Sequence, residues 1–318
     1  MEVIHMSYPQ PALNIEPAAL ALGFFDGVHR GHQKVIRHAV EIAKTKGIKS
    51  GVMTFYPHPK EILRPDEADQ VKYLSTLDEK INLIDALGVD YLFIVTFDES
   101  FADLSPQQFV DQFLIRQSVR HVIAGFDYTY GRMGKGTMET LPFHSRGMLE
   151  RTVVNKVKSE DEKISSTSIR DSLIKGDIEK VNAYLGRVYS LTGHVEQGDQ
   201  RGRTIGFPTA NVSIDQKTLM PANGVYAVTV RTAGEEKIHK GICNIGFKPT
   251  FNDKHPETPV LEAHIFDYEG DLYDQELSVS FHKFIRGEQK FSGPDQLVRQ
   301  INLDSEQVKA FFAGKQKD

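Results

Sequence analysis

Two histidines stand where an apolar stretch gives way to a helical pattern, in the segment Gly23–His32. A strand that turns into a helix directs unpaired main-chain N–H groups and the positive end of the helix dipole at the turn. Such a turn binds anions, and phosphate is the common ligand. Its glycines allow the main chain to approach a ligand closely, and His29 and His32, three residues apart, can reach the same side of it. The segment therefore predicts a phosphate site.

The same two imidazoles could instead form half of a metal site, or they could be two solvated side chains. A catalytic zinc site needs a third protein ligand. No His-Glu-x-x-His helix and no cysteine lies near these histidines in the sequence. We therefore favour phosphate over metal at this turn.

Two further segments of the first half carry polar groups beside expected elements. Gly125–Gly131 follows a strand and precedes the basic, glycine-rich Arg132–Gly136. Its aromatic residues and Asp127 suggest a wall that binds a nucleotide or another ring, although loops of this kind also serve simply as turns. Ser165–Arg170 brings four hydroxyls and an arginine to a helix start, which predicts a second anion site or, alternatively, a capped helix with a solvated arginine.

The second half has its own candidate site, in the glycine-rich segment Gly198–Asn211. Such a loop could cover phosphates, or it could be a turn before an edge strand. Thr209 and Asn211 alternate onto one face of the following strand and offer oxygen ligands suited to Mg²⁺. Glu262 interrupts the apolar stretch Val260–Phe266. It is either an exposed strand residue or, if it faces the phosphate region, a general base for an attacking hydroxyl.

The first half must position its polar groups with alternating strands and helices. An amphipathic helix is expected over Gln33–Lys46, and Thr76 and Ser105 are expected to cap two more. Alternation of this kind predicts a parallel sheet with right-handed crossovers, whose ligands bind beyond the carboxyl ends of the strands. The expected strands are Leu20–Phe25, Gly51–Tyr56, Tyr91–Phe97 and His121–Ala124.

The periodicity changes near residues 184–188. Asp177 can cap a last short helix that ends at Leu185, where Gly186 can stop it. Short stretches of period two then predict a small β-barrel or sandwich, covered by an amphipathic helix over Pro294–Phe312. The expected strands of this part are Tyr189–Glu196, Val225–Thr232, His239–Ile245, Leu261–Phe266 and Glu276–Phe284.

Composition limits the class of protein. The 318 residues carry a formal net charge of −5, and 40% of them are hydrophobic, which fits two folded domains and gives no encouragement to a nucleic-acid partner. Cys243 is the single cysteine, so an intrachain disulfide is excluded. We expect no secretion signal, no membrane span and no obligatory protein partner, and we expect a cytoplasmic protein.

Taken together, the motifs resemble the bacterial bifunctional riboflavin kinase/FAD synthetases (FMN adenylyltransferases) over essentially the whole chain. The nucleotidyltransferase module of that family is matched by Gly23–His32, Gly125–Gly131 and Ser165–Arg170. Its kinase module is matched by Gly202–Asn211, Asn223–Tyr226 and Arg286–Phe291. The resemblance implies an α/β plus all-β protein, with a Rossmann-like nucleotidyltransferase domain at 1–185 and a Greek-key-like β-barrel kinase domain with a C-terminal helix at 186–318.

The resemblance also implies two reactions: riboflavin and ATP give FMN and ADP, and FMN and a second ATP give FAD and pyrophosphate, with Mg²⁺ as the metal. A protein that keeps only one activity and a flavin-binding sensor without catalysis are the competing hypotheses. The implied site residues fall into four groups: catalytic Glu262, His29, His32 and Arg170; nucleotide- or phosphate-binding Gly23, Phe25, Asp26, Gly31, Asp127, Ser166, Thr167, Gly202, Arg203 and Gly206; flavin-binding Tyr128, Arg286, Glu288 and Phe291; and metal-binding Thr209 and Asn211.

Overall fold

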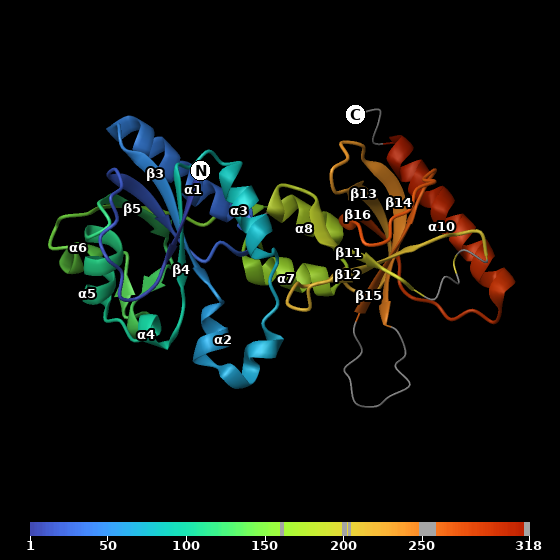
Figure 1. Cartoon of the computed structure of the whole chain (residues 1–318), viewed down its shortest axis with the longest axis horizontal. Helices are drawn as coiled ribbons and strands as arrows, with labels where there is room; N and C mark the ends of the chain where they lie inside the picture. The colour runs from blue at the N-terminus through green and yellow to red at the C-terminus, as the bar shows by residue number, and fades with distance from the viewer. Residues whose placement is uncertain (160–161, 199–201, 203–204, 248–258, 315–318) are drawn as a thin grey trace. The chain divides into compact units, whose positions relative to one another are not determined.

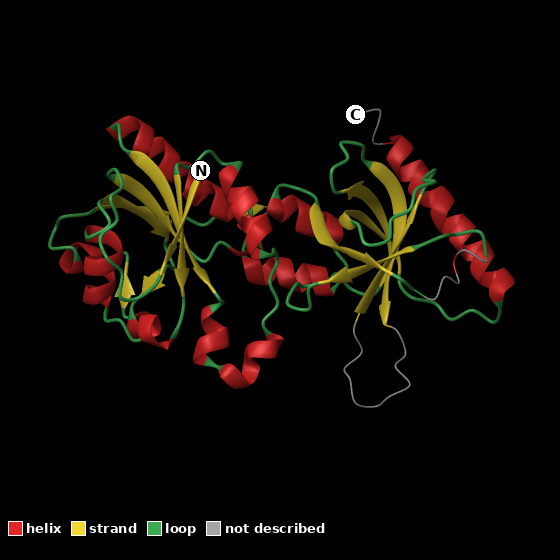
Figure 2. Cartoon of the chain, in the orientation of Figure 1, coloured by secondary structure: helices red, strands yellow, loops and turns green. Residues whose placement is uncertain are grey.

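The computed structural model describes residues 1–159, 162–198, 202, 205–247 and 259–314. The chain forms two compact units, Met1–Ser166 and Thr167–Asp318. Each has a layer of strands with helices packed on it (Figure 2). Over the described residues, no helix combines the length and the apolar character that a membrane crossing would need.

The first unit is built on a six-stranded sheet in which every neighbouring pair is parallel. The chain runs outward from β2 through β3 to β4, and then returns to the other side of β2 for β5 and β8. Figure 1 labels β3, β4 and β5 of this sheet. The strand order therefore reverses between β2 and β5, the position where open parallel sheets bind ligands. In spatial order the strands are β1 (Glu2–Met6), β4 (Tyr91–Thr96), β3 (Lys49–Tyr56), β2 (Ala18–Leu22), β5 (Val119–Gly125) and β8 (Glu150–Val154).

The central strands of this sheet are apolar on both sides, so both faces must be covered, and helices cover them. Ala21 packs with α1 (Arg30–Lys46) and α3 (Leu77–Asp85), whereas Leu20 packs with the opposite cluster. That second cluster includes residues of α4 (Glu99–Ala102), α5 (Pro106–Phe109) and the π-helical η3 (Val110–Ile115). The remaining elements are η1 (Asp26–Val28), α2 (Pro59–Leu63), η2 (Pro65–Gln70), β6 (Thr129–Tyr130), η4 (Arg132–Gly134), β7 (Gly136–Thr137), α6 (Leu141–His144), β9 (Lys158–Ser159) and β10 (Glu162–Lys163).

The expected strands and helices of this unit are present, with shifted ends. Thr76 accepts the N–H of Glu79, and Ser105 forms a reciprocal capping box with Gln108. The strand expected to reach Phe25 stops three residues earlier, at Leu22. Strands β1 and β8 were not expected. Both lie at the edges of the sheet and carry several exposed residues, so neither shows the continuous apolar run of a central strand.

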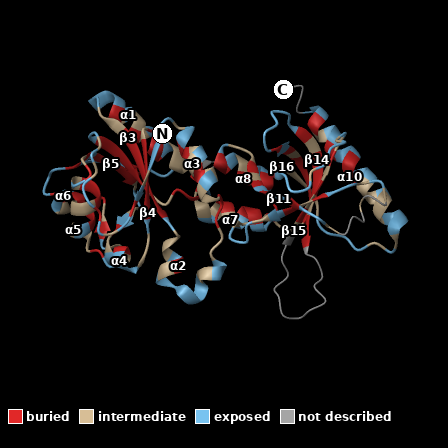
Figure 3. Ribbon diagram, in the orientation of Figure 1, coloured by how far each residue is buried: buried red, intermediate tan, exposed pale blue. Residues whose placement is uncertain are grey.

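The second unit contains a closed barrel of six antiparallel strands. Strands β13, β14 and β15 are consecutive neighbours, and β16 returns to pair with β13, which is a Greek-key arrangement. The amphipathic helix α10 (Pro294–Gly314) packs through Val308 and Phe312 on Val225, Ala227 and Ile242 of the barrel. The strands are β11 (Tyr189–Glu196), β12 (Ala210–Ile214), β13 (Gly224–Thr232), β14 (His239–Phe247), β15 (Pro259–Ile265) and β16 (Glu276–Arg286). Buried residues concentrate in these strands (Figure 3).

Two helices precede the barrel, α7 (Ser166–Ile174) and α8 (Ile178–Leu185). As expected, Asp177 caps α8, and Gly186 ends it with a left-handed φ of 71°. The Asn182 side chain donates to the Phe281 carbonyl at 2.8 Å and accepts the Tyr189 N–H at 2.7 Å, so α8 packs on the barrel. Residues 167–185 thus belong with the second compact unit, and a functional boundary at 185 stays a prediction.

Two candidate active sites

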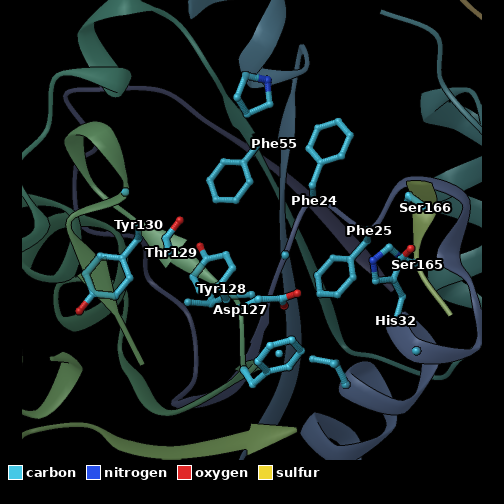
Figure 4. Close-up of a pocket in the computed structure, with 18 of the residues that line it drawn as sticks. Phe24, Phe25, His32, Phe55, Asp127, Tyr128, Thr129, Tyr130, Ser165 and Ser166 are labelled. Atoms are coloured by element: carbon cyan, nitrogen blue, oxygen red, sulfur yellow. The ribbon is translucent and has the colours of Figure 1, made fainter. Parts of the chain in front are cut away.

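A cavity of about 700 Å³ lies in the first unit, beyond the carboxyl ends of β2 and β5. This is the point where the strand order reverses, so the topology itself locates the site. Figure 4 shows His32, Ser165 and Ser166 gathered on one side of the cavity, and Thr129 and Tyr130 on the opposite side. The expected residues that line it are Gly23, Phe25, His29, Gly31, His32, Asp127, Tyr128 and Ser166.

The turn after β2 adopts an unusual backbone that explains its glycines. Phe25 has a left-handed φ of 55°, and its ring covers Gly23 so closely that a Cβ there would lie 2.8 Å from the ring. A Cβ on Gly31 would lie 3.0 Å from the His29 ring. Both glycines therefore leave room for a neighbouring aromatic ring. The sequence had suggested only that they let the main chain approach a phosphate.

His29 has a second function that the sequence pattern did not reveal. Its Nδ1 accepts the main-chain N–H of His32 at 3.2 Å, so His29 is the N-cap of α1. The helix therefore begins at Arg30, three residues earlier than expected. Because Nδ1 accepts this bond, the proton of a neutral His29 ring lies on Nε2, which can donate to a ligand. The two histidine rings stack with centroids 3.5 Å apart.

Asp26 differs from the other expected phosphate residues. Its side chain is buried, and its carboxylate accepts the Leu74 N–H at 3.0 and 3.2 Å. Asp26 is not among the residues that line the cavity. The carboxylate fixes the turn, and a contact from this residue to phosphate would have to come from its main chain.

The hydroxyl-rich segment at the start of α7 reaches the same turn. The Ser166 hydroxyl donates to the Asp26 carbonyl at 3.2 Å, so it must rotate before it can donate to a phosphate. Thr167 is exposed and Arg170 is half-buried. The division between the compact units falls between Ser166 and Thr167, so the part that Thr167 and Arg170 play at the cavity stays a prediction.

Lysines supply positive charge at this cavity, although the sequence pattern did not single them out. Lys163 forms an ion pair with Asp127 at 2.9 Å, and Lys156 lies over the Phe126 ring at 4.5 Å. Both lysines and Phe126 line the cavity. Asp127, expected near nucleotide or metal, is therefore partly neutralised by a neighbouring ammonium group.

The rest of the cavity wall is aromatic. Tyr128 lies beside Tyr130 with ring centroids 6.4 Å apart, and burial raises the pKa of Tyr128 above its usual range, which keeps its phenol protonated. Such a wall suits a flat, largely apolar ring. Further rings of the wall come from Phe24, Phe55, Phe97, Phe101 and Phe109, none of which the sequence analysis named as a ring-binding residue.

The second unit has its own cavity, of about 590 Å³, between the outer face of the barrel and α10. Barrel residues Val225 and Ile242 and helix residues Leu297 and Ile301 form its apolar surface. Gly206 and Asn211 are not among the described residues that line it, and Arg203 lies outside the described residues. The expected residues that line it are Gly202, Thr209, Glu262, Arg286, Glu288 and Phe291.

Glu262 stands in a row of polar residues across three strands. In the strand register it is directly opposite Asn211 of β12 on one side and Asn244 of β14 on the other. Opposed residues of antiparallel strands point to the same face. Glu262 therefore faces the cavity rather than bulk solvent, and Asn244, which the sequence pattern did not single out, also lines the cavity.

The pKa of the Cys243 thiol is raised above its usual range, mainly by burial and to a smaller extent by the charge of Glu262.

Thr209 and Asn211 are each packed against a glycine. A Cβ on Gly202 would lie 3.3 Å from the Thr209 hydroxyl and would clash with the Phe207 carbonyl, and a Cβ on Gly198 would overlap the Asn211 amide. The absence of a side chain at Gly198 and Gly202 therefore leaves room for the Asn211 and Thr209 side chains. The described residues contain no group of three or more His, Cys, Asp or Glu arranged to hold a metal ion.

Arg286 forms an ion pair with a residue of α10. Its guanidinium contacts the Asp304 carboxylate through Nη2 at 2.7 Å and through Nε at 2.9 and 3.1 Å. Asp304 is buried and also accepts from the Gln300 amide at 2.8 Å. The Arg286 guanidinium lies 5.8 Å from the centroid of the Phe291 ring. This pair holds α10 against the end of β16, at the wall of the cavity.

Comparisons with known proteins match the two halves of the chain to two different families. A family model described as FAD synthetase matches residues 12–168, and one described as riboflavin kinase matches residues 185–312. The bifunctional riboflavin kinase/FMN adenylyltransferase of Bacillus subtilis is 45% identical over 319 residues, which cover 100% of both chains. The chain belongs to the bifunctional riboflavin kinase/FMN adenylyltransferase family.

Other members of the bifunctional riboflavin kinase/FMN adenylyltransferase family are similar over nearly the same length. The Listeria monocytogenes relative is 44% identical over 92% of each chain, and the Escherichia coli K12 relative is 35% identical over 93% of each. A crystal structure named as a macrolide-efflux protein from Streptococcus pneumoniae has a TM-score of 0.89 and 33% identity, covering 97% of this chain and 99% of its own. The expected family, fold class and enzyme class are therefore confirmed.

Proposed function

We propose that the chain carries out both reactions of its family, each in its own cavity. The first cavity would bind FMN and ATP and form FAD and pyrophosphate, and the second would bind riboflavin and ATP and form FMN and ADP. The observation that carries this proposal is the presence, in each unit, of a separate cavity that joins a glycine-containing turn to an aromatic or apolar wall.

In the first cavity, the FMN phosphate would attack the α-phosphorus of ATP and displace pyrophosphate. The protein has to position two anions and neutralise their charge, and no covalent intermediate with the protein is needed. His29, which carries its proton on Nε2, His32 and the N-terminus of α1 would stabilise the departing pyrophosphate, assisted by Lys163. The aromatic wall would hold the flavin ring.

In the second cavity, the carboxylate of Glu262 would accept the proton of the riboflavin 5′-hydroxyl as that oxygen attacks the γ-phosphorus of ATP. Phe291 and Glu288 would contact the flavin side of the cavity. Arg286 would act through its pair with Asp304, by fixing α10 over the substrate.

We propose Mg²⁺ as the metal of the kinase reaction, held by Thr209 and Asn211. A hydroxyl and an amide carbonyl are oxygen donors that suit Mg²⁺, but two neutral ligands are too few without water and the substrate phosphates. When bound, the ion would neutralise phosphate charge. We further propose a cytoplasmic location, which fits the free Cys243 thiol.

One experiment separates the two sites: incubate the protein with riboflavin, ATP and Mg²⁺ and follow FMN and FAD by chromatography. Glu262→Gln should reduce FMN formation at least 100-fold, because loss of a general base typically costs 10²–10⁴-fold. FAD formation from supplied FMN should continue at the wild-type rate. The exposed Glu269→Gln is the matched control. A protein that binds flavin but forms neither product would instead be a flavin sensor, and equal loss of both reactions in Glu262→Gln would contradict separate sites.

A further inference from the structure

The turn Phe24–Val28 is strained and needs support from its surroundings. Two of its residues other than glycine have left-handed backbone angles, Phe25 with φ 55° and Val28 with φ 38°. For a β-branched residue such as Val28 this is a pronounced outlier, and such a backbone conformation is energetically unfavourable. A backbone of this kind persists only where neighbouring groups impose it.

Three segments impose it through hydrogen bonds: residues 74–75, Thr54 of β3 and Lys80 of α3. The Leu74 N–H donates to the Asp26 carboxylate, and the Gly27 N–H donates to the Ser75 hydroxyl at 3.2 Å. The Phe24 carbonyl accepts from the Thr54 hydroxyl at 2.8 Å and from the Lys80 ammonium at 3.1 Å. The turn is therefore hydrogen-bonded at Phe24, Asp26 and Gly27, and one of the donors is Lys80 of α3.

Lys80 is an unusual choice for this position. Its side chain is 1% exposed, and its Nζ lies 4.3 Å from the centroid of the Phe24 ring. Burial of an ammonium group is costly, and it lowers the pKa of Lys80 to about 8, an effect that the charge of Asp26 partly opposes. Thr54 alone would satisfy the Phe24 carbonyl, so stability does not require a lysine here.

We propose that Lys80 is a positioning residue for FMN adenylylation, which holds both the carbonyl and the ring of Phe24 and thereby fixes the turn that presents His29 to the ATP phosphates. Lys80 does not line the cavity, whereas Phe24 and His29 do. The side chain acts from beneath the site, through main chain that leads directly into the cap of α1. The proposal rests on adenylylation in the first cavity.

The test is the replacement Lys80→Met, which keeps the length of the side chain and removes its donor and charge. The kcat for adenylylation of supplied FMN should fall at least tenfold, and the KM for ATP should change less than threefold. We expect this pattern because the turn is misplaced and not removed. Thermal unfolding should stay at or above the wild-type temperature. Riboflavin phosphorylation in the same protein should be unchanged, as should both activities in Lys44→Met, an exposed lysine of α1.

A double-mutant cycle distinguishes a positioning role of Lys80 from a general loss of structure. Thr54→Val removes the other donor to the same carbonyl, so its effect on the adenylylation kcat should be non-additive with that of Lys80→Met. If Lys80→Met does not fold, Thr54→Val alone should still lower kcat with little change in KM. Adenylylation within twofold of wild type in Lys80→Met, or additive effects in the cycle, would overturn the proposal. Failure of the wild-type protein to adenylylate FMN would instead refute the proposed function.

Discussion

His29 caps the helix that carries His32: the Nδ1 of the first ring accepts the main-chain N–H of the second residue at 3.2 Å, while the two rings stack. One side chain thus serves helix α1 and the phosphate site together. This double use makes the effects of different substitutions at His29 separable.

We expect His29→Ala to lose both functions and His29→Asn to lose only one. Alanine removes the cap at a cost of about 1 kcal/mol in unfolding free energy, whereas asparagine is a good N-cap and should restore most of it. Both variants should lose at least 100-fold in adenylylation, since neither retains an imidazole N–H. Chemical denaturation and FAD formation from supplied FMN measure the two effects. Wild-type FAD formation in His29→Asn would remove the imidazole from the mechanism.

The Arg286–Asp304 pair should matter to the kinase alone. Asp304→Asn leaves a mostly buried guanidinium without its counter-charge, so we expect a loss of about 3 kcal/mol in the stability of the second unit. The KM for riboflavin should rise about tenfold because α10 forms one wall of its cavity. Glu306→Gln, which breaks an exposed ion pair with Lys309 on the same helix, is the control and should cost less than about 1 kcal/mol. An unchanged KM for riboflavin would show that the pair does not shape the site.

A substitution at Asn244 tests the proposed role of Glu262 as the general base. The two residues are opposite each other on neighbouring strands, so Asn244→Asp would place a second carboxylate beside Glu262. Repulsion between like charges raises the pKa of the pair. The acidic limb of the kinase pH–rate profile should therefore move to higher pH, by about one unit. The adenylylation profile serves as the internal reference, and a kinase limb that stays in place would argue against Glu262 as the base.

Lys80 should also make the free energy of unfolding depend on pH. Its pKa in the folded protein, about 8, lies below the 10.5 of an unperturbed lysine, so the unfolded chain binds more protons between these two values. The free energy of unfolding from this group therefore rises with pH through that window, by at most about 3 kcal/mol. The penalty is fully present below pH 8 and disappears above about pH 10.5. Denaturation of wild type and Lys80→Met at pH 7 and pH 10 should show the difference between their unfolding free energies changing by about 2.5 kcal/mol. A constant difference would contradict a depressed pKa.

The contacts of α8 predict which fragment of the second unit is stable. A fragment of residues 167–318 retains the two hydrogen bonds of Asn182 to the barrel, whereas a fragment of residues 186–318 loses them. We expect the shorter fragment to be less stable by about 2 kcal/mol or more, at about 1 kcal/mol for each bond. Urea unfolding followed by circular dichroism compares them. Equal midpoints would favour a structural boundary at residue 185.

The sequence by itself determined the order of elements, the two kinds of fold and the segments that carry the chemistry. These properties are local: the apolar period of two or 3.6, the caps at Ser105 and Asp177, and the glycines beside His29 all act between residues close in the chain. For the same reason the edge strands β1 and β8 escaped prediction, since an edge strand lacks a distinctive pattern of burial.

Only the tertiary structure decided which side chains reach the sites and which support them. Asp26 turned away to Leu74, Arg286 paired with Asp304, and Asn244 lies beside Glu262, and each of these relationships joins different elements. Lys80, which no sequence pattern singled out, is buried next to Phe24. Direction and burial of a side chain depend on what packs around it, and that information is not contained in the spacing of residues along one segment.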